Sequence, residues 1–227
     1  MKKFLAFAAI LALPLTANAT IVGSRHDFAS GSGAATAEST ATRICVFCHV
    51  PHNARTNGNA IWNRDDSAGT TFTWGAATPT VGGTTLPGTI GIPSRRCFSC
   101  HDGTQSIGAL ANGANYTTAW TGGSVDSSGH LTSGTYQIDP TNMAGNHPVS
   151  VAYPGSAAAY NGTTSRTTAA GFYTAIGSMS STINLYTSGG GTGIECGSCH
   201  DPHLTDNGYF LRDTLTNSQL CRNCHTK

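Results

Sequence analysis

The chain has 227 residues, and its 12 basic side chains nearly balance its 11 acidic ones. Charged residues make up only 10% of the sequence and form no basic stripe, which excludes the usual pattern of a nucleic-acid-binding protein. The 28 glycines and many serines and threonines would alone predict a weakly ordered chain, so the fold needs another source of apolar core.

The N-terminus predicts export. Two lysines precede an apolar run over residues 4–15, and an Ala-Asn-Ala cleavage site follows at 17–19. This order is typical of a secretory signal peptide over residues 1–19, and the run is too short for a transmembrane helix. Cleavage would leave residues 20–227, with 10 basic against 11 acidic side chains, because 2 of the 12 basic residues are removed.

Along the rest of the chain, the secondary-structure signals are short. No stretch keeps a 3.6-residue apolar period beyond about two turns. We expect short strands over 70–74 and 149–153, glycine-rich loops at 82–91 and 188–193, and a helix over 214–224. The predicted fold is mostly coil with short helices and few short strands.

All eight cysteines lie in four copies of the pentapeptide Cys-x-x-Cys-His. The copies are Cys45-Val46-Phe47-Cys48-His49, Cys97-Phe98-Ser99-Cys100-His101, Cys196-Gly197-Ser198-Cys199-His200 and Cys221-Arg222-Asn223-Cys224-His225. In this pattern both thiols bond covalently to a haem and the adjacent histidine ligates its iron. We therefore predict four c-type haems, each held by two cysteines and one proximal histidine, and short helical turns framing each motif.

Other uses of paired cysteines fit poorly. A structural zinc site takes four ligands and gives no reason for a histidine to follow each pair. A disulfide framework would not confine every cysteine to one spacing, and a thioredoxin-like site needs a βαβ pattern, which is not visible. Haem also provides the missing apolar core, with about 52 of the 208 residues after position 19 for each haem. The fold class predicted is a multihaem cytochrome c, one unit wrapped around its haems.

The first and third motifs share an extension that the other two lack. Each continues as His-x-Pro-His, ending at His52 and at His203. Arg64 and Arg212 follow these extended motifs in the tripeptides Trp-Asn-Arg and Phe-Leu-Arg, and we predict that they are equivalent. The alternation of extended and plain motifs predicts two dihaem halves, over about 20–110 and 140–227.

The numbers of histidines and methionines decide which distal ligands are available. Of nine histidines, five remain after the proximal ones, whereas the mature chain has only Met143 and Met179. Methionine therefore cannot ligate all four irons, but histidine can. Bis-histidine ligation of every haem is predicted, with one histidine to spare.

The positions of the five remaining histidines indicate which four are distal ligands. His52 and His203 follow their own proximal histidines by three residues, a reach of about 10 Å that does not pass around a porphyrin to its other face. Each is therefore predicted to ligate another haem. His26 and His147 precede the first and second motif pairs and complete the distal set. His130 lies in a Ser/Gly-rich loop and is predicted to be exposed.

The segments CVFCHVPHNA, AIWNR, SRRCFSCHDGT, NHPVSVAY and ECGSCHDPH resemble the doubled-CxxCH multihaem cytochromes. With the tetrahaem length, the signal peptide and the early His26, the chain is most similar to the OmcE-type extracellular cytochromes that polymerise into nanowires. The resemblance runs over nearly the whole mature chain and is thinnest in 103–140 and 155–193. It implies a continuous chain of stacked haems, with one distal histidine supplied by the next subunit.

The positions of the chain ends suggest how such a polymer would form. His26 is the seventh residue after the cleavage site, and the fourth motif ends two residues before the last residue. We predict a head-to-tail homopolymer in which His26 ligates a haem of the neighbouring subunit.

Three functions agree with these patterns. The leading one is electron hopping along the haems of an extracellular filament, from redox partners in the cell envelope to outside acceptors, with no enzymatic step. The alternative is a monomeric periplasmic shuttle with His26 used in its own subunit, although the chain has only three lysines for docking partners. A multihaem reductase is the third, and it needs an open iron position that five spare histidines argue against. No nucleic acid partner and no membrane span are predicted.

Overall fold

Short elements joined by coil make up the described part of the protein, as predicted from the sequence. The computed structural model describes residues 21–31, 37–55, 60–65, 72–74, 86–112, 120–132, 134–153, 183–188 and 191–225. The predicted signal peptide at 1–19 lies outside these ranges. In chain order, the elements are the 3-10 helix η1 (Cys45–Phe47), helix α1 (Ile92–His101), strands β1 (Val151–Ala152), β2 (Tyr186–Ser188) and β3 (Gly191–Ile194), helix α2 (Cys196–Cys199), the 3-10 helix η2 (Thr216–Ser218) and helix α3 (Gln219–Arg222).

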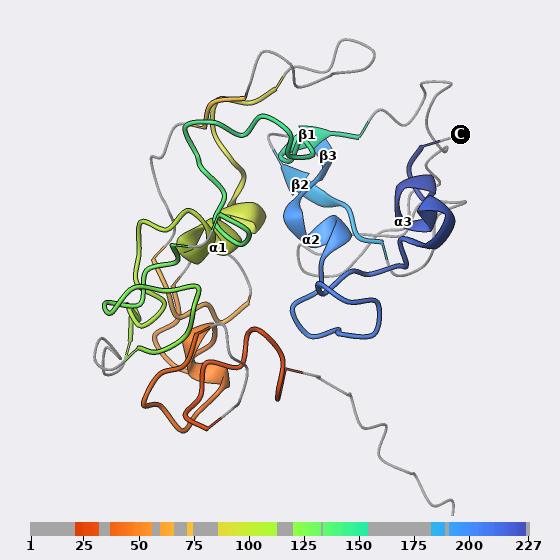
Figure 1. Cartoon of the computed structure of the whole chain (residues 1–227). Helices are drawn as coiled ribbons and strands as arrows, with labels where there is room; N and C mark the ends of the chain where they lie inside the picture. The colour runs from red at the N-terminus through yellow and green to blue at the C-terminus, as the bar shows by residue number, and fades with distance from the viewer. Residues whose placement is uncertain are drawn as a thin grey trace, which may run out of the picture.

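Helical turns coincide with the four motifs. The first motif begins on η1, the second ends α1, the third forms α2, and the fourth begins on α3. Cysteines three residues apart lie on one face of such a turn, so both point to the same side. Figure 1 shows α1 between the N-terminal segments and the sheet with α2, whereas α3 lies at the far edge near the C-terminus. Within the described ranges, no helix has the length and apolarity needed to cross a bilayer.

The three strands form one antiparallel sheet in the order β1-β3-β2. Val151 of β1 pairs with Ile194 of β3, and Tyr186 of β2 pairs with Gly193 of β3. The strand predicted at 149–153 is thus confirmed in a shorter form. The loop predicted at 188–193 is wrong for its described residues, because Ser188 and Gly191 are paired strand residues, while 189–190 lie outside the described ranges. The sequence has a Gly-Gly dipeptide at 189–190, which is itself a hairpin signal. Residues 72–74 of the other predicted strand are coil, and 70–71 lie outside the described ranges.

The helix predicted over 214–224 is interrupted. Asn217 and Ser218 have φ values of 52° and 58°, in the left-handed region, so η2 and α3 are separate turns. Asparagine enters this region more readily than most residues, which explains why the break falls here.

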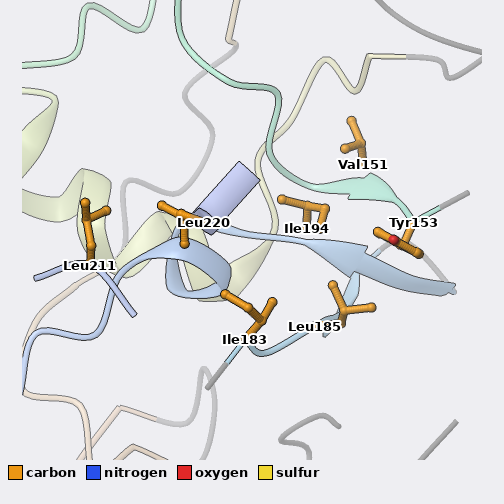
Figure 2. Packing of buried hydrophobic residues seen from close by; sticks show 7 residues of the cluster. All are labelled: Val151, Tyr153, Ile183, Leu185, Ile194, Leu211 and Leu220. Carbon is orange, nitrogen blue, oxygen red and sulfur yellow. The ribbon is translucent and has the colours of Figure 1, made fainter. Parts of the chain in front are cut away.

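The buried apolar side chains form three clusters. One packs the sheet against the third and fourth motifs, with Cys199 and Cys224 at its edge, and consists of Val151, Tyr153, Ile183, Leu185, Ile194, Leu211 and Leu220 (Figure 2). A second surrounds Cys48 and Cys100 of the first two motifs and includes Phe28, Phe47 and Trp120. The third joins Phe72, Ile90, Phe98 and Met143. Two of the three clusters thus border motif cysteines.

Glu195 connects the two halves from a fully buried position, with 1% of its surface exposed. Its carboxylate accepts hydrogen bonds from the hydroxyls of Ser94 on α1 and Ser150 before β1, and it caps α2 in a capping box with Ser198. The Glu195 carboxylate therefore connects α1, the segment before β1 and α2 beside the third motif.

We expect Glu195→Ala to lower the free energy of unfolding by about 3 kcal/mol, because two buried hydroxyls and a helix cap lose their acceptor. Urea unfolding of the haem-loaded protein measures this change. Glu38→Ala is the matched control, since Glu38 accepts a hydrogen bond from the Gly31 amide at the exposed surface. Equal losses in both variants would contradict the role assigned to Glu195.

Candidate haem-binding sites

The eight motif cysteines form no disulfides. Burial raises the pKa of Cys48 and Cys224 to about 12 and that of Cys199 to about 11, so these sulfur atoms are neutral thiols in apolar surroundings. The thiols of Cys97 and Cys196 are hydrogen-bonded to one another, which raises the pKa of Cys97 and lowers that of Cys196. The second and third motifs therefore touch at their first cysteines.

Three proximal histidines are oriented by backbone carbonyls. The Nδ1 atoms of His49, His101 and His200 lie 2.6, 2.6 and 2.9 Å from the carbonyl oxygens of Ala60, Tyr136 and Tyr209 respectively. An Nδ1–H that donates to a carbonyl leaves Nε2 deprotonated and free to bind a metal. The chain thus presents the same ring nitrogen at three of its four motifs.

Three of the motif histidines face a second imidazole. Two rings bound through Nε2 to opposite sides of one iron, at metal–nitrogen distances of about 2 Å, have centroids about 6 Å apart. The observed centroid separations are 6.1 Å for His49 and His203, 6.1 Å for His101 and His26, and 6.4 Å for His225 and His147. Each pair joins one motif histidine to one of the predicted distal histidines, at the separation that one iron requires.

His26 packs against two aromatic rings of its own chain. Its ring stacks on Phe210 at a centroid distance of 4.3 Å and lies 6.0 Å from Phe28. Burial lowers the pKa of His26 to about 3, so the imidazole is neutral, as a metal ligand must be. A partner for His26 in a neighbouring subunit stays a prediction; within one chain, its ring lies 6.1 Å from that of His101.

The remaining histidines lie at the surface. His52 and His200 are both exposed, and His200 is left with His52 and His130 as its candidate partners within the chain. The side chain of His130 is 36% exposed, and its Nδ1 lies 3.2 Å from a carboxylate oxygen of Asp126. His130 is therefore held at the surface by a hydrogen bond with Asp126.

The loops that follow the two extended motifs have the same backbone pattern. An antiparallel bridge joins His49 to Trp62 in the first half, and another joins His200 to Leu211 in the second. The amide of the next residue along, Asn63 or Arg212, donates to the carbonyl of the second motif cysteine at 2.9 Å in both halves.

Side chains confirm this register and correct the predicted arginine equivalence. Asn63 Nδ2 donates to the carbonyl of Val46, and Arg212 Nε donates to that of Gly197, the same motif position. Arg212 is therefore equivalent to Asn63, and Arg64 to Asp213. The letter pattern misaligned them because the loop from the proximal histidine to its carbonyl partner spans 11 residues in one half and 9 in the other.

Two further features fit a large group at these sites. The indole Nε1 of Trp62 is buried beside His49 without a hydrogen-bond acceptor among the described residues. An open cavity of about 430 Å³ lies beside the fourth motif and is lined by Asn217, Ser218, Cys221, Arg222 and His225. A buried donor and a cavity at the attachment residues are what a bound haem with polar edge groups would fill. Trp62 belongs to the Trp-Asn-Arg tripeptide noted in the sequence, but no sequence signal marks its indole as a buried donor.

One protein family matches this arrangement. Residues 190–227, which hold the third and fourth motifs, match the family described as Doubled CXXCH motif. This match supports a multihaem c-type cytochrome. The motifs indicate covalently bound haem, and a c-type cytochrome receives its haem after export from the cytoplasm. Among curated proteins, none matches the chain.

Asp201 is a site residue that the sequence reading missed, although the first motif has Val50 in its place. Its carboxylate lies 3.4 Å from Nδ1 of His203 and 3.0 Å from Arg212. The hydrogen bond with His203 lowers the pKa of Asp201 to about 2, so the carboxylate is ionised and orients the ring.

We expect Asp201→Ala to make His203 easier to displace. Ferric protein should bind cyanide about tenfold more tightly at one iron, because a ligand without its orienting partner competes less well. Absorbance titration with cyanide measures this affinity. Asp206→Ala, on the exposed part of the same loop, is the control and should leave the titration unchanged.

Proposed function

We propose that this protein transfers electrons along four bis-histidine c-type haems. The observation that carries the proposal is the three imidazole pairs, in which a motif histidine and a distant histidine lie 6.1–6.4 Å apart. Nothing in the sequence order of these residues requires that spacing. Bis-histidine ligation of iron provides a physical reason for it.

When bound, haem supplies an iron that accepts and releases one electron. The chain contributes the thiols that attach the group, the two imidazoles that fill its axial positions, and the apolar clusters that exclude water. With both axial positions filled, substrate has no iron position to occupy, which is why we propose an electron carrier and not an enzyme.

The equivalence of the two halves suggests the fourth pair of proximal and distal histidines. His203 follows His200 and faces His49, while His52 follows His49 in the equivalent position. We infer that His52 serves the motif of His200, so that the two extended motifs exchange distal ligands. Each extended motif then holds its own haem from one side and its counterpart's haem from the other.

The thiol contacts support a continuous path through the chain. Cys97 and Cys196 are hydrogen-bonded, Cys48 and Cys100 border one apolar cluster, and Cys199 and Cys224 border another. Neighbouring motifs therefore approach one another in chain order. Such proximity is what electron hopping between attached haems requires.

We propose further that the protein works outside the cell as a subunit of a head-to-tail filament. Exposure of both His52 and His200 supports this, because the fourth axial bond can close between two chains as readily as within one. His26 would then act within its own subunit, unlike the expectation from its place near the N-terminus. A monomeric periplasmic shuttle is the competing function, with the fourth bond closed within one chain.

The test is to purify the exported protein, count its haems by intact mass, and image it by cryo-electron microscopy. Four haems with a low-spin spectrum would support electron transfer, and fewer than four would contradict the haem count. Filaments would support the extracellular conduit, whereas discrete monomers at high concentration would replace it with the shuttle.

A further inference from the structure

The junction between the first two motifs holds a buried arginine. Arg64 is 1% exposed, and its guanidinium donates to the hydroxyl and carbonyl of Ser99 at 3.2 and 3.0 Å. Ser99 is the third residue of the second motif. The carbonyls of Ser106, at 2.8 Å, and Ile107 accept the other hydrogen bonds. No carboxylate in the described ranges pairs with Arg64. A full positive charge is thus buried at this junction, solvated only by neutral groups.

The equivalent junction in the second half holds an aspartate. One carboxylate oxygen of Asp213 accepts a hydrogen bond from Asn223 at 2.7 Å, and the other accepts one from the Thr214 amide at 2.8 Å. Asn223 is the third residue of the fourth motif, the counterpart of Ser99, and is 2% exposed. The same structural position therefore connects an extended motif to a plain motif in both halves, with opposite charge.

At two neighbouring equivalent positions, the net charge is zero in both halves. Arg212 and Asp201 pair with one another at 3.0 Å, so together they add no net charge in the second half. Their counterparts in the first half are Asn63 and Val50, which carry no charge. Over these three positions the first half carries one positive charge and the second half one negative charge.

We propose that Arg64 and Asp213 set the two haem pairs at different reduction potentials, with the first pair higher. A buried cation opposes the extra positive charge of ferric iron and raises the potential of a nearby haem, whereas an anion lowers it. This inference rests on the proposed function, because it requires attached haems. The chain thereby biases electrons toward its N-terminal half.

Potentiometric titration of the haem-loaded protein, followed by visible absorbance, tests this assignment in Arg64→Gln and Asp213→Asn. Arg64→Gln is expected to lower, and Asp213→Asn to raise, the reduction equilibrium constant of the adjacent haems by about tenfold, which is about 59 mV for one electron. Arg55→Gln and Asp206→Asn remove exposed charges from the same two halves and are the matched controls. Both controls should leave the titration curve unchanged.

Arg64→Lys separates charge from structure. It keeps the cation but loses part of the hydrogen-bond set, so it should retain the wild-type potentials while lowering stability. Asp213 is only partly buried, so Asp213→Asn decides the test if Arg64→Gln does not fold. Shifts in the same direction, or shifts no larger than those of the controls, would overturn the inference. The haem count and spin state of the same samples show which idea has failed: missing haems contradict the proposed function, whereas four low-spin haems with unmoved potentials contradict only this inference.

Discussion

Replacing His203 with alanine should convert one attached haem to the high-spin state without changing the number of haems attached. His203 faces His49 at 6.1 Å and takes no part in thioether attachment, so its loss opens one axial position without releasing a haem. Low-temperature electron paramagnetic resonance of the ferric protein measures the spin state, and intact mass counts the haems.

The matched control is His130→Ala. It removes the same side chain from a surface loop, where Asp126 is its partner, and should leave the spectrum entirely low-spin. A fully low-spin spectrum in His203→Ala would show that another residue fills the distal position, and the assignment of the pair would be wrong. A high-spin signal from His130→Ala would show that His130 is a ligand.

The second large effect concerns how much the second and the fourth motifs contribute to the stability of the fold. Replacing both Cys97 and Cys100 with alanine should remove one haem and lower the free energy of unfolding by more than about 4 kcal/mol. Cys97 contacts Cys196 across the junction of α1 and α2, and Phe98 beside it is 1% exposed in the third cluster. A haem lost here leaves a void between the two halves.

The comparison is the double replacement of Cys221 and Cys224. Their motif borders an open cavity. It begins on α3, which lies at the edge of the molecule in Figure 1, so this variant should stay folded with one haem fewer. Intact mass and urea unfolding of both proteins provide the measurements. If the C-terminal variant were as unstable as the central one, the second motif would have no special place in the core.

Prediction from the sequence succeeded where the signal was local. The helical turns at the motifs follow from five contiguous residues, and the mostly coiled chain follows from the absence of long apolar periods. Prediction from the sequence failed where a helix break or a strand pairing depended on one or two residues. The left-handed conformations of Asn217 and Ser218 interrupt the predicted helix. Ser188 and Gly191 pair as strand residues where a loop was predicted.

Equivalent positions in the two halves show the same limit. The similar tripeptides in the sequence predicted that Arg64 is equivalent to Arg212. However, the loops that follow the two proximal histidines differ in length by two residues, and only the backbone hydrogen bonds reveal which positions are equivalent. The opposite charges of Arg64 and Asp213 at equivalent positions become apparent only when the two halves are aligned by these hydrogen bonds.

The sequence by itself determined the chemistry of attachment, because two thiols and a histidine at a fixed spacing need no distant contact to define a haem site. By number it predicts histidine as the distal ligand, because methionine cannot serve all four irons, and by reach it predicts that His52 and His203 serve haems other than their own. Only the tertiary structure decided which rings face one another, since His26, His147 and His203 approach their partners across separations of 75, 78 and 154 residues. Pairings over such distances depend on how the coil packs, and no local pattern encodes them.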